Sequence, residues 1–170
     1  ICTDRSSTLN TDGTLFFDLD VKANSLNIFG WSSFMYVIDE ESYTVEIYRK
    51  EDTAMGNEAA LSDINSTIWT LISNGTGVPT LGGVEKVNFN IEAFSLPNGI
   101  SGMAVKVSGR QTYFIGNQTI NSIPAGIFEM TGVSSMALSG TVQNNRTVQS
   151  CLGFDVAPTQ TPTQAPTTLS

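Results

Sequence analysis

The chain has 170 residues, a net charge of −8 at pH 7 and an isoelectric point near 4.3. Such an anionic chain repels phosphate backbones, and no run of Lys or Arg makes a local exception, so nucleic acids are not expected partners. The chain contains no His, which excludes the usual Ser–His and Cys–His catalytic dyads and His-ligated metal sites. No apolar run approaches the ~20 residues that span a bilayer, so we expect no membrane span.

Residues 15–21 predict the first strand. Alternate side chains of a strand point to opposite faces, and here the apolar ones share a face: Phe17, Leu19 and Val21. Asp18 and Asp20 lie on the other face. We interpret these two carboxylates as part of a solvated strand face, and a calcium site or an acid–base pair is the alternative.

Residues 25–31 and 34–38 predict the next two strands. The acidic loop 39–42, with three adjacent carboxylates, lacks the spaced ligands of a dedicated calcium loop and predicts a solvated turn. Residues 43–50 alternate cleanly, and a long connection leads to a strand at 66–72. Exposed aromatic side chains can stack on sugar rings. Three candidates for such stacking are Trp31, Tyr48 and Trp69, although for Trp69 we expect core packing.

The remaining strands are short and are separated by turns rich in Gly, Asn and Pro. They are expected at 85–92, 102–108, 111–115, 127–130, 135–139 and 152–156. A chain with about nine to ten such strands predicts an all-β fold, and we expect an antiparallel β-sandwich of jelly-roll type. This domain occupies residues 1–157.

Cysteines and glycosylation motifs indicate an oxidising compartment. Cys2 and Cys151 predict one disulfide that closes nearly the whole domain, with two free thiols as the alternative. Four Asn-X-Thr sequons predict N-glycosylation. Their acceptor residues are Asn65, Asn74, Asn117 and Asn145. Charged residues make up only 14% of the chain, well under the roughly 25% of an average domain. We therefore expect a secreted glycoprotein, extracellular or on a cell surface.

Residues 158–170 differ in composition from the rest of the chain. Their regularly spaced prolines favour an extended polyproline conformation, and Thr with Pro is typical of O-glycosylated stalks and linkers. Candidate O-glycosylation sites are Thr159, Thr161, Thr163, Thr167 and Thr168. Our hypothesis is that this tail contacts a neighbouring copy of the chain, by strand addition or by docking in a groove, and so forms a homo-oligomer or filament.

Several motifs follow one another in a recognisable order. They are TVEIYRK at 44–50, Gly-Asn-Glu at 56–58, Trp-Thr-Leu-Ile at 69–72, a Gly/Thr/Pro turn at 75–80, and Tyr113 with Gly116. Over residues 8–120 this order resembles an extracellular β-sandwich domain that occurs in diatom and other marine secreted surface proteins with Pro–Thr linkers. Residues 121–150 depart from the usual ending of that family. The resemblance implies adhesive or structural use, and it supplies no catalytic residues.

Two functions fit these observations best. The first is a structural or adhesive extracellular glycoprotein, and the alternative is a carbohydrate-binding module or lectin. An enzyme without His would need a carboxylate pair of the glycosidase type, and none of the acidic residues lies in a distinctive motif. We therefore assign no catalytic residue, no metal ligand and no cofactor.

Overall fold

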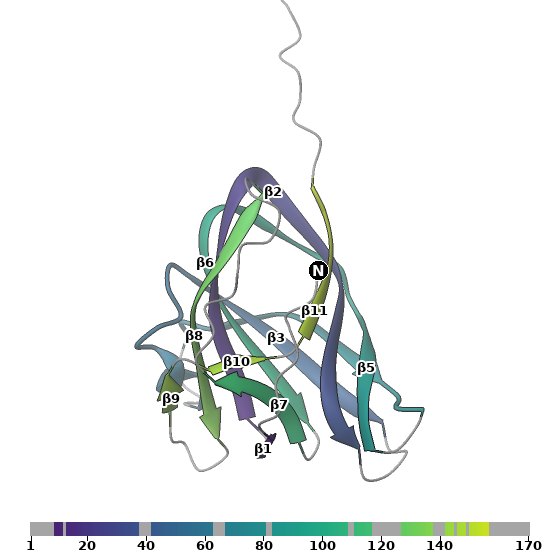
Figure 1. Ribbon diagram of the computed structural model, residues 1–170. Coiled ribbons are helices and arrows are strands. Elements are labelled where there is room, and N and C mark those ends of the chain that lie inside the picture. The colour runs from purple at the N-terminus through teal and green to yellow at the C-terminus, as the bar shows by residue number, and fades with distance from the viewer. Residues whose placement is uncertain are drawn as a thin grey trace, which may run out of the picture.

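The computed structural model describes residues 9–11, 13–37, 42–62, 67–80, 83–108, 111–116, 127–137, 142–144, 146–148 and 150–156. These residues form an 11-stranded antiparallel sheet and one short 3₁₀ helix (Figure 1). The elements are β1 (Leu9–Thr11), β2 (Gly13–Val37), β3 (Tyr43–Glu51), η1 (Glu58–Ser62), β4 (Thr70–Gly77), β5 (Gly83–Ile91), β6 (Phe94–Ser108), β7 (Gln111–Gly116), β8 (Phe128–Ala137), β9 (Val142–Asn144), β10 (Arg146–Val148) and β11 (Ser150–Val156). The all-β prediction is confirmed.

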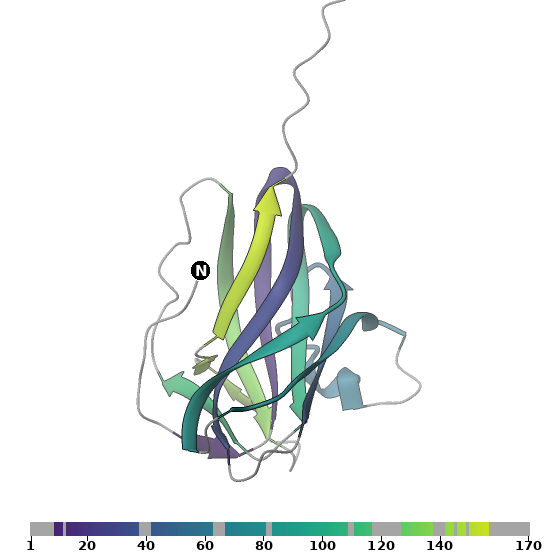
Figure 2. The ribbon, with the colours of Figure 1, turned by 90° about the vertical axis from the view of Figure 1, so that its right-hand side faces the viewer.

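Strand β2 organises the sheet. It is 25 residues long and bends sharply, so that its two halves lie in different walls of the molecule (Figures 1 and 2). The first half lies between β6 and β8, and the second half pairs with β11 and β5. The sequence predicts separate strands over this stretch, and this prediction is wrong because the chain bends here without leaving the sheet.

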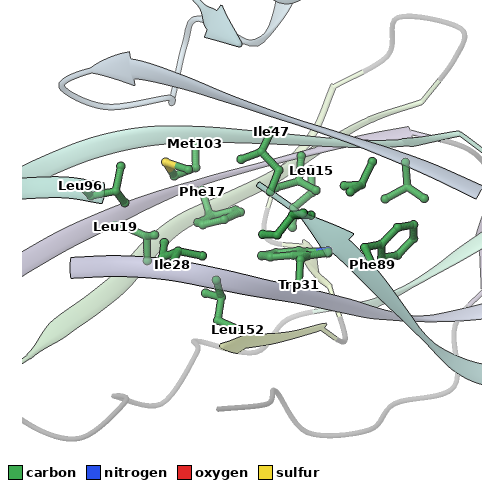
Figure 3. Packing of buried hydrophobic residues seen from close by; sticks show 14 of the residues in the cluster. Leu15, Phe17, Leu19, Ile28, Trp31, Ile47, Phe89, Leu96, Met103 and Leu152 are labelled. Atoms are coloured by element: carbon green, nitrogen blue, oxygen red, sulfur yellow. The ribbon is translucent and has the colours of Figure 1, made fainter. Parts of the chain in front are cut away.

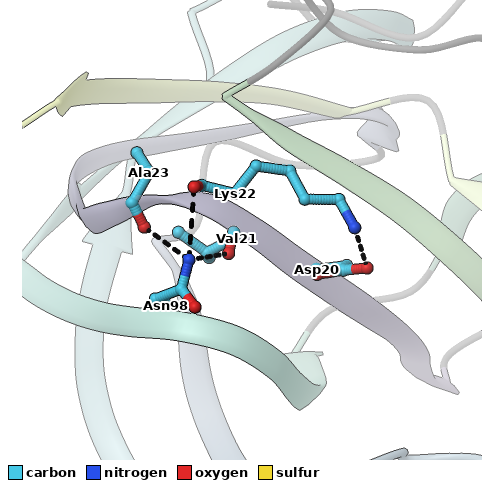
Figure 4. Close-up of polar contacts among 5 residues, drawn as sticks. All are labelled: Asp20, Val21, Lys22, Ala23 and Asn98. Carbon is cyan, nitrogen blue, oxygen red and sulfur yellow. Dashed lines mark hydrogen bonds and ion pairs between the residues drawn. The ribbon is translucent and has the colours of Figure 1, made fainter.

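Hydrogen bonds from two other segments hold the bend of β2. Nδ2 of Asn98, in β6, donates to the carbonyl oxygens of residues 21–23 at 3.0, 3.2 and 3.0 Å (Figure 4). An amide nitrogen carries two hydrogens, so the three acceptors share them. The backbone amides of Lys22 and Ala23 donate to the carbonyl of Ile127 at 2.8 and 3.2 Å. The bend therefore keeps its backbone groups paired while the register between β2 and β6 shifts.

The strand pairings close into a ring. Starting from β2, the order of neighbours is β5, β4, β3 and β6, and β6 pairs again with β2. The walls that face each other across the interior therefore belong to one connected sheet. A sandwich of two separate sheets, as the sequence predicts, is not confirmed by these pairings.

The seam between β4 and β5 is the shortest join of the ring, with only two residue pairs, and it depends on Gly75. A Cβ atom on Gly75 would lie 2.3 Å from the carbonyl oxygen of Asn90 and 2.8 Å from Cγ2 of Ile91. Only glycine allows the two backbones to approach so closely. Gly77 is in the same position, since its Cβ would lie 2.8 Å from the carbonyl oxygen of Asn88, so two glycines of β4 permit the close approach to β5.

The interior of the ring is a single apolar core (Figure 3). The ring of Phe17 stacks against Trp31, with centroids 6.1 Å apart and an interplanar angle of 12°. Phe154 of β11 meets Phe128 edge-on at 5.2 Å. Along four strands the alternating apolar residues all face this core, as burial of one face of a strand requires. They are Phe17, Leu19 and Val21; Val45 and Ile47; Val87, Phe89 and Ile91; and Met103, Val105 and Val107.

Candidate functional site

The connection between β3 and β4 folds back over the outer face of the sheet. Asp52 adopts a left-handed backbone conformation with a φ of 63°, which Asp tolerates better than most residues, and forms a bridge to Ser101 of β6. The connection then lies directly on the backbone of Gly102. A Cβ atom on Gly102 would lie 2.6 Å from the amide nitrogen of Ala54 and 2.7 Å from the carbonyl oxygen of Asp52.

Asp18 attaches this connection to the sheet. Its side chain is buried, with the residue 7% exposed, and both carboxylate oxygens accept hydrogen bonds. The hydroxyl of Thr53 donates to Oδ2 at 2.6 Å, and the amide of Ala54 donates to Oδ1 at 2.7 Å. The prediction of a solvated face is therefore wrong for Asp18, because the connection covers it. The carboxylate acts as a structural acceptor.

A second apolar cluster fills the space beneath the connection. Phe16, Ala54, Trp69 and Ala104 are its buried members, and Tyr48, Met55, Ala60 and Leu61 pack against it. The indole of Trp69 lies 5.7 Å from the ring of Phe16, and its Nε1 donates a 3.1 Å hydrogen bond to the carbonyl oxygen of Asn57. Trp69 is therefore a core residue, as the sequence favours, and it anchors the connection.

Two of the three candidates for sugar stacking are buried. Trp31 is 4% exposed in the main core, where Nε1 donates to Oγ of Ser33 at 3.0 Å, and Trp69 is 8% exposed. Neither indole offers a face to a sugar. Tyr48 is half-buried on the outer face, and its hydroxyl donates to Glu46 at 3.2 Å. Burial raises the pKa of Tyr48 above its usual value, and the charge of Glu46 raises this pKa further.

The Asn74 sequon lies on the outer face of β4. Asn74 and Thr76 are exposed, whereas Gly75 between them turns inward to the β4–β5 seam. Residues two apart on a strand share a face, so the acceptor amide and the hydroxyl that the sequon requires both point to solvent. On the neighbouring strand β3, Glu46 is the register partner of Asn74. Glu46 pairs with Lys106 at 3.3 Å, so this half of the outer face is polar.

An open cavity of about 410 Å³ lies where β3 ends and β4 begins. We call it the β3–β4 groove. Its described lining residues are Arg49, Lys50, Glu51, Thr67, Ile68, Thr70 and Ile72. The sequence reasoning did not identify this site. The one available signal was the pair of adjacent cations in a chain with only eight Lys and Arg residues.

Two cations lie in the β3–β4 groove without ion pairs to any described residue. Nε of Arg49 donates to Oγ of buried Ser101 at 3.1 Å, which fixes the guanidinium on the wall of the groove. Nζ of Lys50 donates to the carbonyl oxygen of Glu51 at 2.7 Å. By contrast, Lys22 and Lys106 each pair with a carboxylate. The groove therefore offers hydrogen-bond donors with positive charge.

Asp18 and Asp20 do not converge on a common ligand. Asp18 binds the connection, whereas Asp20 forms an ion pair with Lys22 at the bend of β2 (Figure 4). Within the described ranges, no group of three or more acidic, Cys or His residues is arranged to hold a metal ion.

Several predicted sites fall on residues that the structure does not describe. The backbone of Cys151 lies in β11 with Ser32 as its register partner, but the structure does not describe its side chain. The others are Cys2, the acidic residues 39–41, the sequon residues Asn65, Asn117 and Asn145, and the tail threonines Thr159, Thr161, Thr163, Thr167 and Thr168. The disulfide and these glycosylation sites stay predictions.

No known protein family matches this chain, and no curated protein matches it. Among the described residues, no helix has the length and apolar character needed to cross a membrane.

Proposed function

We propose that this protein is a structural or adhesive extracellular glycoprotein, in which the tail of residues 158–170 contacts a neighbouring subunit. The observation that carries the proposal is the geometry of the Asn74 sequon. A sequon inside a regular strand is usable only if its acceptor and its hydroxyl share an exposed face, and Asn74 and Thr76 do so.

The division of the outer face supports the same function. One half is covered by residues 52–62 of the β3–β4 connection, which pack on an apolar cluster. The other half, around Asn74, carries short polar and charged side chains that pair with one another, such as the hydroxyls of Thr44 and Ser108. A glycan on Asn74 would extend from this polar half, so it would cover no part of the apolar packing.

The test is to map the glycans on the secreted protein. The full chain is expressed in a eukaryotic secretory host, and peptides containing Asn74 are analysed by mass spectrometry before and after enzymatic removal of N-glycans. We expect Asn74 to be occupied. Thr76→Val should abolish occupancy, and Thr76→Ser, which keeps the hydroxyl, should retain it. A folded, secreted chain with Asn74 unmodified would count against the proposal.

A further inference from the structure

We propose that the β3–β4 groove binds an anionic saccharide, with a sulfate or carboxylate group of the sugar on Arg49 and Lys50. The inference is independent of glycosylation at Asn74, because none of the groove residues belongs to that sequon. It names a ligand class for a cavity whose size, about 410 Å³, lies in the range of small-molecule sites.

The charge of the groove is the first argument. The chain carries a net charge of −8, so on balance it repels anions. Arg49 and Lys50 nevertheless both line the groove, and neither has an ion-pair partner among the described residues. Glu51 contributes one carboxylate, so the described residues of the lining carry one net positive charge.

The orientation of Arg49 is the second argument. A guanidinium has five N–H donors in a rigid planar fork that matches the oxygens of carboxylate and sulfate groups. The bond from Nε to Ser101 uses one donor, and Ser101 is only 1% exposed, so this contact holds the side chain in place. The remaining donors belong to the two terminal nitrogens. A fixed guanidinium loses less side-chain entropy when it binds an anion.

The other lining residues favour a sugar over a bare anion. Thr67 and Thr70 are exposed and present hydroxyls that can exchange hydrogen bonds with sugar hydroxyls. Ile68, which is 40% exposed, and the half-buried Ile72 provide aliphatic surface for the C–H face of a sugar ring. Ionic, hydroxyl and aliphatic contacts together are what a charged sugar unit requires.

The test is calorimetric titration of the secreted full chain. Its N-glycans are removed enzymatically beforehand. Thr67 lines the groove and is also the third residue of the Asn65 sequon, so a glycan on Asn65 would be attached close to the groove. The probes are a sulfated oligosaccharide, the same oligosaccharide without sulfate, an oligouronate and inorganic sulfate. We expect the sulfated sugar or the oligouronate to bind, with affinity that falls as salt is added. The neutral sugar should not bind measurably, and inorganic sulfate should bind at least about tenfold more weakly than the charged sugar.

Three variants locate the binding in the groove. Arg49→Gln should weaken binding at least about tenfold, and Lys50→Gln should weaken it by about threefold. Lys86→Gln removes the same charge from β5, outside the groove, and should change affinity less than about twofold. Thermal unfolding of each variant checks the fold, and Lys50→Gln keeps the test valid if Arg49→Gln unfolds. The proposal is overturned if Lys86→Gln weakens binding as much as the groove variants do. It is also overturned if the neutral sugar or inorganic sulfate binds as tightly as the charged sugar. Absence of binding of both charged sugars at millimolar concentration would overturn it as well.

Discussion

The backbone amide of Ala54 donates a 2.7 Å hydrogen bond to the carboxylate of Asp18, across 36 positions of sequence. This bond joins the connection after β3 to the first half of β2. It converts an acidic residue of a strand face into an anchor, and it helps to seal the second apolar cluster around Phe16 and Trp69.

Asp18→Ala should therefore destabilise the protein. The substitution leaves the buried amide of Ala54 without its acceptor and removes the bond from Thr53, so we expect a loss of about 3 kcal/mol in the free energy of unfolding. Urea denaturation monitored by Trp fluorescence measures this loss. The control is Asp20→Ala, which removes a surface ion pair with Lys22 and should cost less than about 1 kcal/mol. Equal losses in the two variants would show that the anchor does not exist.

Gly102→Ala should push the β3–β4 connection away from β6. The added methyl group would meet backbone atoms of Asp52 and Ala54, which cannot rotate away as a side chain can. We expect a loss of about 1–3 kcal/mol in unfolding free energy. Gly30→Ala is the matched control in β2, where the nearest atom would lie 3.6 Å away, an ordinary contact. A Gly102→Ala variant as stable as Gly30→Ala would contradict the close packing.

The alternation of apolar residues predicts the class of fold and the inward faces of the strands, because burial on one face of a strand leaves a period of two in the sequence. It does not predict the continuity of β2. The bend is held by Asn98 and by Ile127, and both residues lie far along the chain from the bend. Residues 22–24 on their own show only an interruption of the apolar alternation, which predicts the end of a strand.

The candidate site could likewise be predicted only in part from the sequence. The sequon at Asn74 is visible as a motif, but its exposure depends on the way Gly75 packs against β5. The burial of Asp18 and the assembly of the β3–β4 groove also depend on where the connection lies. The position of the connection on the sheet cannot be predicted from the periodicity of the sequence. The stacking candidates Trp31 and Trp69 are aromatic residues of the core, and composition alone does not separate the two roles.

Asn98→Asp should weaken the bend of β2 in a pH-dependent way. The replacement has nearly the same shape, but an ionised carboxylate would face the carbonyl oxygens of residues 21–23 without a hydrogen to donate. The folded state would therefore raise the pKa of the new carboxyl group above about 3.9. The deficit in stability relative to the wild type should be small below that pH and should grow as the pH rises.

Chemical denaturation from acidic to neutral pH measures this deficit. Asn27→Asp is the control, since Oδ1 of Asn27 accepts a bond from Ser95 and a carboxylate can accept it equally well. A deficit that is independent of pH, or that is the same in both variants, would contradict the role of Asn98.

Tyr48 should make stability fall at alkaline pH. Its pKa is raised in the folded protein by burial and by Glu46, so the unfolded chain loses the phenolic proton first. The contribution of this group is complete below the usual pKa of about 10 and is lost as the pH rises from there through the raised pKa. Tyr48→Phe should remove this part of the alkaline dependence. Denaturation at several pH values above neutrality measures it, and an unchanged dependence in Tyr48→Phe would contradict the assignment.

The central claim, that the protein has a structural role in which its tail joins neighbouring subunits, is tested most directly by imaging. The secreted full chain is compared by electron microscopy and sedimentation with a chain that ends at Ala157. We predict filaments or ordered oligomers for the full chain and separate particles for the shortened one. Separate monomers of the full chain at every concentration, or identical assemblies of the two chains, would contradict the claim.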